Sequence, residues 1–115
     1  MSVLVTPRRL DDVVILDLSG RITIGEGTVV LRGTMKKLLN AGHRKFVMNL
    51  EDVDYIDSAG LGELVMLFTT VRREGGHVKL LKLTHRVRDL LQITKLLTVF
   101  DSYENEMDAL KSLRA

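Results

Sequence analysis

Residues 54–64 join a segment typical of a β-strand to a segment typical of an amphipathic helix, with a serine at the junction. Before them, residues 45–50 form a largely apolar run. After them, residues 59–74 carry apolar side chains at helical spacing, namely Leu61, Leu64, Val65, Phe68 and Val71. A strand that leads into a helix and then into another strand favours a right-handed crossover between parallel strands. This stretch therefore predicts an α/β fold.

The same alternation of strand-like and helix-like segments continues along the chain. Further strands are predicted over residues 3–6, 13–18, 78–83 and 97–100. Further helices are predicted over residues 28–39, from the N-cap Thr84 to residue 91, and after an N-cap at Asp101 or Ser102. The predicted order ββαβαβαβα gives a layered α/β architecture in one domain, residues 1–115.

Two connections are predicted from their turn residues. Pro7 and the charged residues that follow it are expected to end the first strand and to form the turn of an antiparallel hairpin. Residues 20–27 contain three glycines and are expected to be a loop.

Composition narrows the function classes. The chain has 115 residues, no cysteine and a net charge of +2. Without cysteine it has neither disulfides nor a thiolate site, and with no signal-peptide pattern at its start this favours a cytoplasmic protein. Membrane insertion is not expected, because no run approaches the roughly 18 apolar residues of a spanning helix. The three histidines are scattered singly, so neither a metal nor a cofactor is predicted.

Ser58 is the candidate functional residue. It is predicted to be the N-cap of the helix over residues 59–74, which would make Ser58→Ala cost about 1 kcal/mol. Gly60 and Gly62 follow in the first turns, where each glycine costs about 1 kcal/mol relative to alanine. Either another element packs closely there, or a partner protein must approach the backbone, in which case Gly60→Val would harm binding more than folding.

A phosphate on Ser58 would face the unpaired N–H groups and the positive end of the helix dipole. The fold would tolerate the phosphate, which would add roughly two negative charges to a surface that already carries Asp54 and Asp57. Ser58 is therefore a predicted phosphorylation site in a protein-binding module. The alternative is that Ser58 only caps the helix.

The sequence DSAGLG at residues 57–62 resembles the D-S-x-G-L-G signature of STAS domains, the anti-sigma-factor antagonists. The resemblance covers nearly the whole chain, including LSGRI at residues 18–22 and NLEDVDYID at residues 49–57. It implies a STAS fold, with a mixed, mostly parallel sheet of about five strands and four helices mainly on one side.

The resemblance also implies a function without enzymatic activity. Ser58 would be phosphorylated by an anti-sigma factor that is also a serine kinase. The unphosphorylated antagonist would sequester that kinase, free a sigma factor and so regulate transcription, and a metal-dependent serine phosphatase would restore it. The implied partner-binding residues are Thr23, Ile24, Asp54, Asp57, Ser58, Ala59, Gly60, Leu61 and Gly62. A homodimer is left open.

The loop before the first helix departs from the family pattern. Sporulation-type antagonists usually carry an aspartate where this chain has Thr23. Ile22 and Ile24 would make this contact surface more apolar, and one of the two is expected to be buried. A different partner kinase is therefore compatible with the same phosphorylation site.

Other functions fit less well. A serine hydrolase needs G-x-S-x-G, but Ile56 stands at the first glycine and no acid is placed to orient a histidine. A dinucleotide site fails because residues 25–30 lack the last glycine of G-x-G-x-x-G. No nucleic-acid partner is expected, since the aromatic content is 4% and the basic residues Lys79, Lys82, Arg86 and Arg88 resemble a solvated face.

One alternative keeps the fold and changes the function. The chain would be a non-switching STAS subunit docked on a transporter or in a stress-signalling complex. It would use the Ser58 turn as a constitutive contact.

Overall fold

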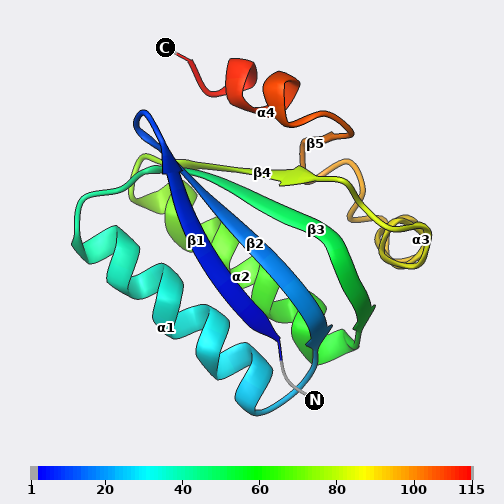
Figure 1. Cartoon of the computed structure of the whole chain (residues 1–115). Coiled ribbons are helices and arrows are strands. Elements are labelled where there is room, and N and C mark those ends of the chain that lie inside the picture. Colours follow the sequence, from blue (N-terminus) through cyan, green and yellow to red (C-terminus); the bar gives the residue numbers. More distant parts are fainter. Residues whose placement is uncertain (1–2, 115) are drawn as a thin grey trace.

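The computed structural model describes residues 3–114 and has the predicted order of elements (Figure 1). The strands are β1 Leu4–Leu10, β2 Val13–Ile22, β3 Lys45–Ile56, β4 His77–Leu81 and β5 Ser102–Tyr103. The helices are α1 Glu26–Asn40, α2 Ser58–Arg73, α3 His85–Ile93 and α4 Glu106–Ser112.

The five strands form one mixed sheet in the order β1-β2-β3-β4-β5. β1 and β2 are antiparallel, as the predicted hairpin requires, and the other neighbours are parallel. The carboxyl ends of β2 and β3 lie side by side, because Ile22 pairs with Ile56. The turn that follows β3 therefore lies next to the loop that follows β2.

Helices cover both faces of the sheet, unequally (Figure 1). Apolar residues of α1, α2 and α3 pack with the sheet in the larger core. α4 packs on the opposite face, where Ala109 and Leu113 contact Val13, Ile15, Val47 and Leu81. Three helices thus lie on one side and one on the other, which agrees with helices mainly on one side. Within residues 3–114, no helix combines the length and apolarity needed to cross a membrane.

The prediction that Pro7 ends the first strand is wrong. β1 continues through Pro7 to Leu10, and the turn consists of Asp11 and Asp12, with Asp11 at φ 57°. β1 is an edge strand, where a proline is tolerated because no outer strand needs its missing N–H. The predicted loop over residues 20–27 is also too long, since β2 ends at Ile22 and α1 begins at Glu26.

The prediction of a strand over residues 97–100 is wrong as well. The last strand is β5, of two residues, and residues 97–100 before it form a turn in which Leu97 packs against the core and Val99 is exposed. Phe100 is buried there, with its ring edge-on to that of Phe68 at 5.1 Å. The last helix is capped by Asn105, whose side chain accepts from the N–H groups of Met107 and Asp108, and not by Asp101 or Ser102.

Arg8 links the edge strand to β2 and to α4. Its Nε donates to Asp17 at 2.6 Å, and its Nη2 donates to Glu106. Asn49 of β3 donates to the same carboxylate of Asp17 at 2.9 Å. The hydrogen bond from Arg8 lowers the pKa of Glu106. Partial burial opposes the shift at Asp17, but hydrogen bonds from Arg8 and Asn49 still lower its pKa.

These shifts predict that acid destabilises the fold. Because the folded-state pKa values of Asp17 and Glu106 lie below their ordinary 3.8 and 4.5, the unfolded chain binds protons first as the pH falls. The stabilisation is fully present above about pH 5 and is lost as the pH falls through the folded-state values. Urea denaturation between about pH 6 and pH 3 should show this fall, and the variant Asp17→Asn/Glu106→Gln should show less of it. Identical pH dependence in both proteins would contradict the assignment.

Candidate functional site

Ser58 is the first residue of α2 and directly follows the turn at the end of β3. The N–H of Asp57 donates to the carbonyl oxygen of Ile22 at 3.3 Å, so this turn is fixed to the end of β2. The loop over residues 23–25 begins at the same place. The predicted site residues of the loop and of the turn are therefore brought together.

Asp57, and not Ser58, is the N-cap of α2. Its Oδ1 accepts from the N–H of Gly60 at 2.7 Å, and its Oδ2 accepts from the N–H of Ile24 at 3.1 Å. The hydrogen bond from Gly60 is the largest cause of a lowered pKa at Asp57, and the one from Ile24 adds to it. Asp57 thus stays ionised and holds the loop against the first turn of α2.

The Ser58 side chain is exposed, and its hydroxyl forms no hydrogen bond within residues 3–114. The prediction that it caps the helix is wrong, because the adjacent carboxylate already accepts the N–H that a cap would take. The hydroxyl therefore has no role in holding the fold, and it is accessible from outside.

The two glycines after Ser58 have different surroundings. A Cβ atom at Gly60 would lie 2.0 Å from the carbonyl oxygen of Ile22, so no larger residue fits while the strand end stays in place. A Cβ atom at Gly62 would meet nothing within 4 Å. Gly60 is explained by close packing of β2, the first of the two expected reasons, so Gly60→Val should harm folding. Nothing in the fold explains Gly62.

The predicted partner-binding residues divide into exposed and buried groups. Ile24 is 77% exposed, and Asp54, Ser58 and Gly62 are exposed too. Half-buried residues are Thr23, Asp57 and Ala59. Gly60 and Leu61 lie in the interior and support the turn from inside, so they are not available as contacts. Ile22 is fully buried, which confirms that one isoleucine of the loop belongs to the core.

An ion pair between a buried glutamate and an exposed arginine near the site was not predicted. Glu63 of α2 is 6% exposed, and its carboxylate lies 2.7 Å from the guanidinium of Arg32 on α1. The pair fixes α2 to α1 one turn after Ser58. Glu63 falls between the apolar residues Leu61 and Leu64, and an acid at such a position is the signal that could have revealed it.

The histidines do not form a catalytic group with Ser58. His43 and His77 lie at the amino ends of β3 and β4, at the opposite edge of the sheet from Ser58. The Nε2 of His85 lies 3.3 Å from the carboxylate of Asp89. Within residues 3–114, no three histidine or acidic residues are grouped so as to hold a metal ion.

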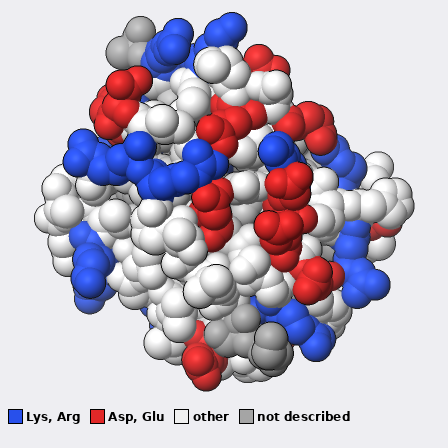
Figure 2. Space-filling model, in the orientation of Figure 1, with Lys and Arg blue, Asp and Glu red and all other residues white. Residues whose placement is uncertain are grey.

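The basic residues considered for nucleic-acid binding are largely paired. Lys79 contacts Asp101 at 2.7 Å, Arg88 contacts Glu104 at 2.9 Å, and Lys82 lies 3.6 Å from Glu51. Figure 2 shows acidic and basic side chains interspersed over one face of the molecule. This mixture gives no continuous positive surface for a phosphate backbone on that face.

The capping geometry predicts different changes in stability for substitutions at two adjacent residues. Asp57→Ala should lower the free energy of unfolding by about 1 kcal/mol, because the N–H of Gly60 loses its acceptor. Ser58→Ala should change it by less than about 0.5 kcal/mol, because the hydroxyl has no partner to lose. Urea denaturation measures both, and equal losses would show that Ser58 shares the cap.

A second pair of variants separates the two glycines. Gly60→Ala should destabilise the fold by about 1–3 kcal/mol, because the added methyl group overlaps the Ile22 carbonyl. Gly62→Ala should stabilise it by up to about 1 kcal/mol, because alanine favours the helix and has room. Thermal and urea denaturation test both. A destabilising Gly62→Ala would mean that the fold does require this glycine.

Comparisons with known proteins agree with this geometry. The family model of the STAS domain matches residues 5–109. The anti-sigma-B factor antagonist of Bacillus subtilis is 32% identical over 101 residues, which cover 88% of this chain and 91% of that protein. The crystal structure of TM1081 from Thermotoga maritima has a TM-score of 0.88 and 28% identity, with 96% of this chain and 95% of the other covered.

The structures of SpoIIAA, an anti-sigma factor antagonist, show the same fold at lower identity. Its unphosphorylated form has a TM-score of 0.75 and 16% identity, covering 97% of this chain and 99% of that one. Its phosphorylated form has a TM-score of 0.74 and 18% identity, covering 96% and 100%. With the family model spanning most of its length, this chain belongs to the STAS domain family.

Proposed function

We propose that this chain is an anti-sigma factor antagonist that binds an anti-sigma-factor serine kinase through the surface around Ser58, and that phosphorylation of Ser58 by the kinase ends the contact. The single observation that carries the proposal is the exposed Ser58 hydroxyl, which is free of hydrogen bonds at the start of α2 in a STAS fold. Relatives of similar length are named as antagonists of anti-sigma factors.

The surface around Ser58 suits a protein partner. Ile24 presents an exposed apolar side chain, and Gly62 leaves the backbone of α2 uncovered one turn after Ser58. Asp54 and the half-buried Thr23 flank them. A partner loop could approach α2 closely at Gly62, which would give this glycine the role that the fold does not.

Phosphorylation of Ser58 would act on the partner and not on the fold. The hydroxyl holds no structural hydrogen bond, and the start of α2 is the positive end of its dipole. The phosphate would bring roughly two negative charges beside Asp54 and Asp57 and repel an acidic or apolar contact. SpoIIAA keeps closely similar TM-scores to this chain in its two forms, which supports a modification that leaves the fold intact.

The cycle requires two enzymes as partners. The kinase transfers the phosphoryl group to Ser58, and a metal-dependent serine phosphatase removes it. Once released from the antagonist, the kinase would bind its sigma factor again. The phosphorylation state of Ser58 would therefore regulate transcription in the cytoplasm.

Ser58 variants test the switch. Serine kinases of the histidine-kinase-like ATPase class from the source organism are purified and titrated by calorimetry against each variant. Ser58→Ala should bind the cognate kinase as the wild type does, and it should gain no phosphate with ATP. Ser58→Asp should bind about tenfold more weakly or worse, because its charge lies in the contact.

Thr98→Asp is the matched control, since Thr98 is exposed, lies in the segment before β5 and makes no hydrogen bond within residues 3–114. It should leave binding unchanged. If Ser58→Asp binds a kinase as tightly as this control does, the switch is excluded, and a constitutive STAS subunit becomes the better description.

A further inference from the structure

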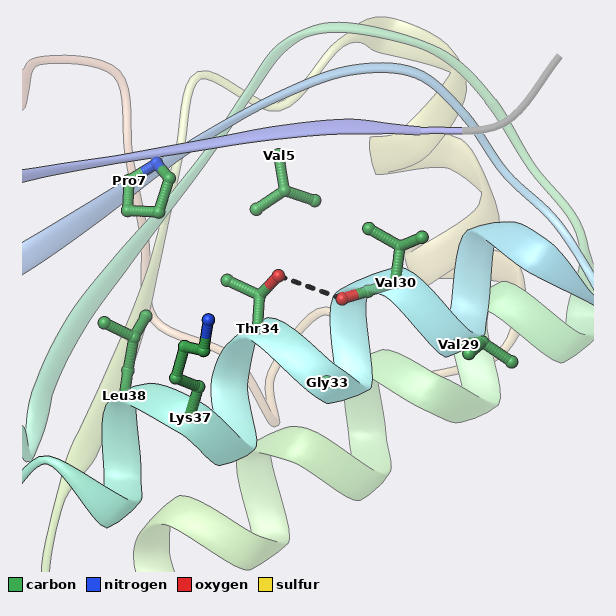
Figure 3. Close-up of a pocket in the computed structure, with 8 residues that line it drawn as sticks. All are labelled: Val5, Pro7, Val29, Val30, Gly33, Thr34, Lys37 and Leu38. Atoms are coloured by element: carbon green, nitrogen blue, oxygen red, sulfur yellow. Dashed lines mark hydrogen bonds between the residues drawn. The ribbon is translucent and has the colours of Figure 1, made fainter.

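α1 has an outward face that the rest of the fold leaves uncovered. Val29 is 60% exposed and Val30 is 37% exposed, and the exposed Gly33 follows one turn later. Beside this face, a groove of about 410 Å³ separates α1 from the edge strand β1 (Figure 3). Val5 and Pro7 line the strand side of the groove. The uncovered surface is thus apolar and continues from helix to strand.

Gly33 has no explanation within the fold. A Cβ atom at this position would meet nothing within 4 Å, so packing does not exclude a larger residue. Glycine in a helix interior is less favourable than alanine. The absence of a side chain at Gly33 instead leaves the backbone of α1 open to close approach from outside.

Two opposite charges bracket the same face. Glu26 lies in the first turn of α1 and Lys37 in the last, three helical turns apart, so they point in nearly the same direction. Neither forms an ion pair within residues 3–114. In contrast, Arg32 on the flank facing α2 is paired with Glu63.

We propose that two copies of this chain associate through this face of α1, with the two helices antiparallel about a twofold axis between residues 31 and 32. That axis places Glu26 against Lys37 of the second copy and Val30 against Gly33 of the second copy. It also places Val29 against Thr34 of the second copy. Each contact occurs twice, as a twofold interface requires.

The order of residues along α1 favours a second copy over an unrelated partner. When a second α1 lies antiparallel, Glu26 meets Lys37 and Val30 meets Gly33, so the face is complementary to itself. Glycine opposite Val30 lets the two backbones approach, and the valine side chain fills the space above Gly33. Extension of the sheet through β1 is disfavoured, since Pro7 has no N–H to offer an added strand. A contact built on one 15-residue helix and the rim of the groove is small, so the dimer should exchange with monomer.

Charge reversal tests the pairing directly. Glu26→Lys places two lysines together across the interface, and Lys37→Glu places two glutamates together. By symmetry each variant turns two attractions into two repulsions, so each should raise the dimer dissociation constant roughly tenfold or more. In an equimolar mixture of the two single variants, both contacts of the heterodimer join a lysine to a glutamate. Heterodimers should therefore form in preference to either homodimer.

The double variant Glu26→Lys/Lys37→Glu gives a second rescue experiment, within a single sequence. It exchanges the two charges, so both pairs across the twofold axis again join a lysine to a glutamate, and the double variant should recover most of the wild-type affinity. Sedimentation velocity from micromolar to millimolar protein measures the wild type, the two single variants and the double variant.

The matched controls are Asp108→Lys and Lys111→Glu on α4. Asp108 and Lys111 also lie in the first and last turns of a helix, and they are exposed on the opposite face of the sheet. These variants carry the same charge changes, and each places an unfavourable charge at a helix end, as the interface variants do. They should dimerise as the wild type does. Circular dichroism confirms that every variant is folded.

Gly33→Arg gives an independent measurement, because the open space around Gly33 accommodates the side chain in the monomer while the second helix is blocked. It should be folded and monomeric. The proposal is overturned if the wild type is monomeric throughout the concentration range. It is also overturned if the single charge variants dimerise as the controls do, or if the double variant associates no better than each single variant. None of these readouts depends on a kinase or on Ser58.

Discussion

The contact between the first turn of α2 and the end of β2 determines the shape of the candidate site. The Ile22 carbonyl lies where any side chain at position 60 would begin, and the same carbonyl accepts the N–H of Asp57. The Asp57 carboxylate then fixes Gly60 and the loop at Ile24. The Asp57 carboxylate and the lack of a side chain at Gly60 thus bring the ends of β2 and β3 and the start of α2 together in one corner of the molecule. Ser58 lies at the outer surface of this corner.

The groups of this corner divide into those that hold the fold and those that are exposed without a structural partner. Asp57 and Gly60 are occupied with neighbouring backbone, whereas the Ser58 hydroxyl and the open side of Gly62 have no partner within residues 3–114. Within residues 57–62, some residues therefore hold the fold and others are exposed without a structural role. The proposed phosphate on Ser58 would have little structural cost, because none of the hydrogen bonds that build this corner involves the Ser58 hydroxyl.

Much of the fold follows from local pattern, and the exceptions depend on distant partners. The order of elements and the burial of one loop isoleucine were predictable, because periodicity and β-branched residues carry that information. The choice of Asp57 over Ser58 as cap was not, since both are good caps and the N–H of Ile24 that also holds Asp57 lies 33 residues away in the sequence. The strand through Pro7 depends on its place at the sheet edge. Leu97 and Phe100 contribute to the core from a turn, without being part of a strand. The buried Glu63 is paired with Arg32, which belongs to another helix.

The strand order β1-β2-β3-β4-β5 follows the chain from one end to the other. Each strand after β1 therefore has as a neighbour a strand that is synthesised before it, which permits the sheet to grow in the direction of synthesis. Arg8 is made early and meets Glu106 across 98 residues of sequence. The ion pair attaches α4 to β1, so it can form only after the chain through Glu106 has been synthesised.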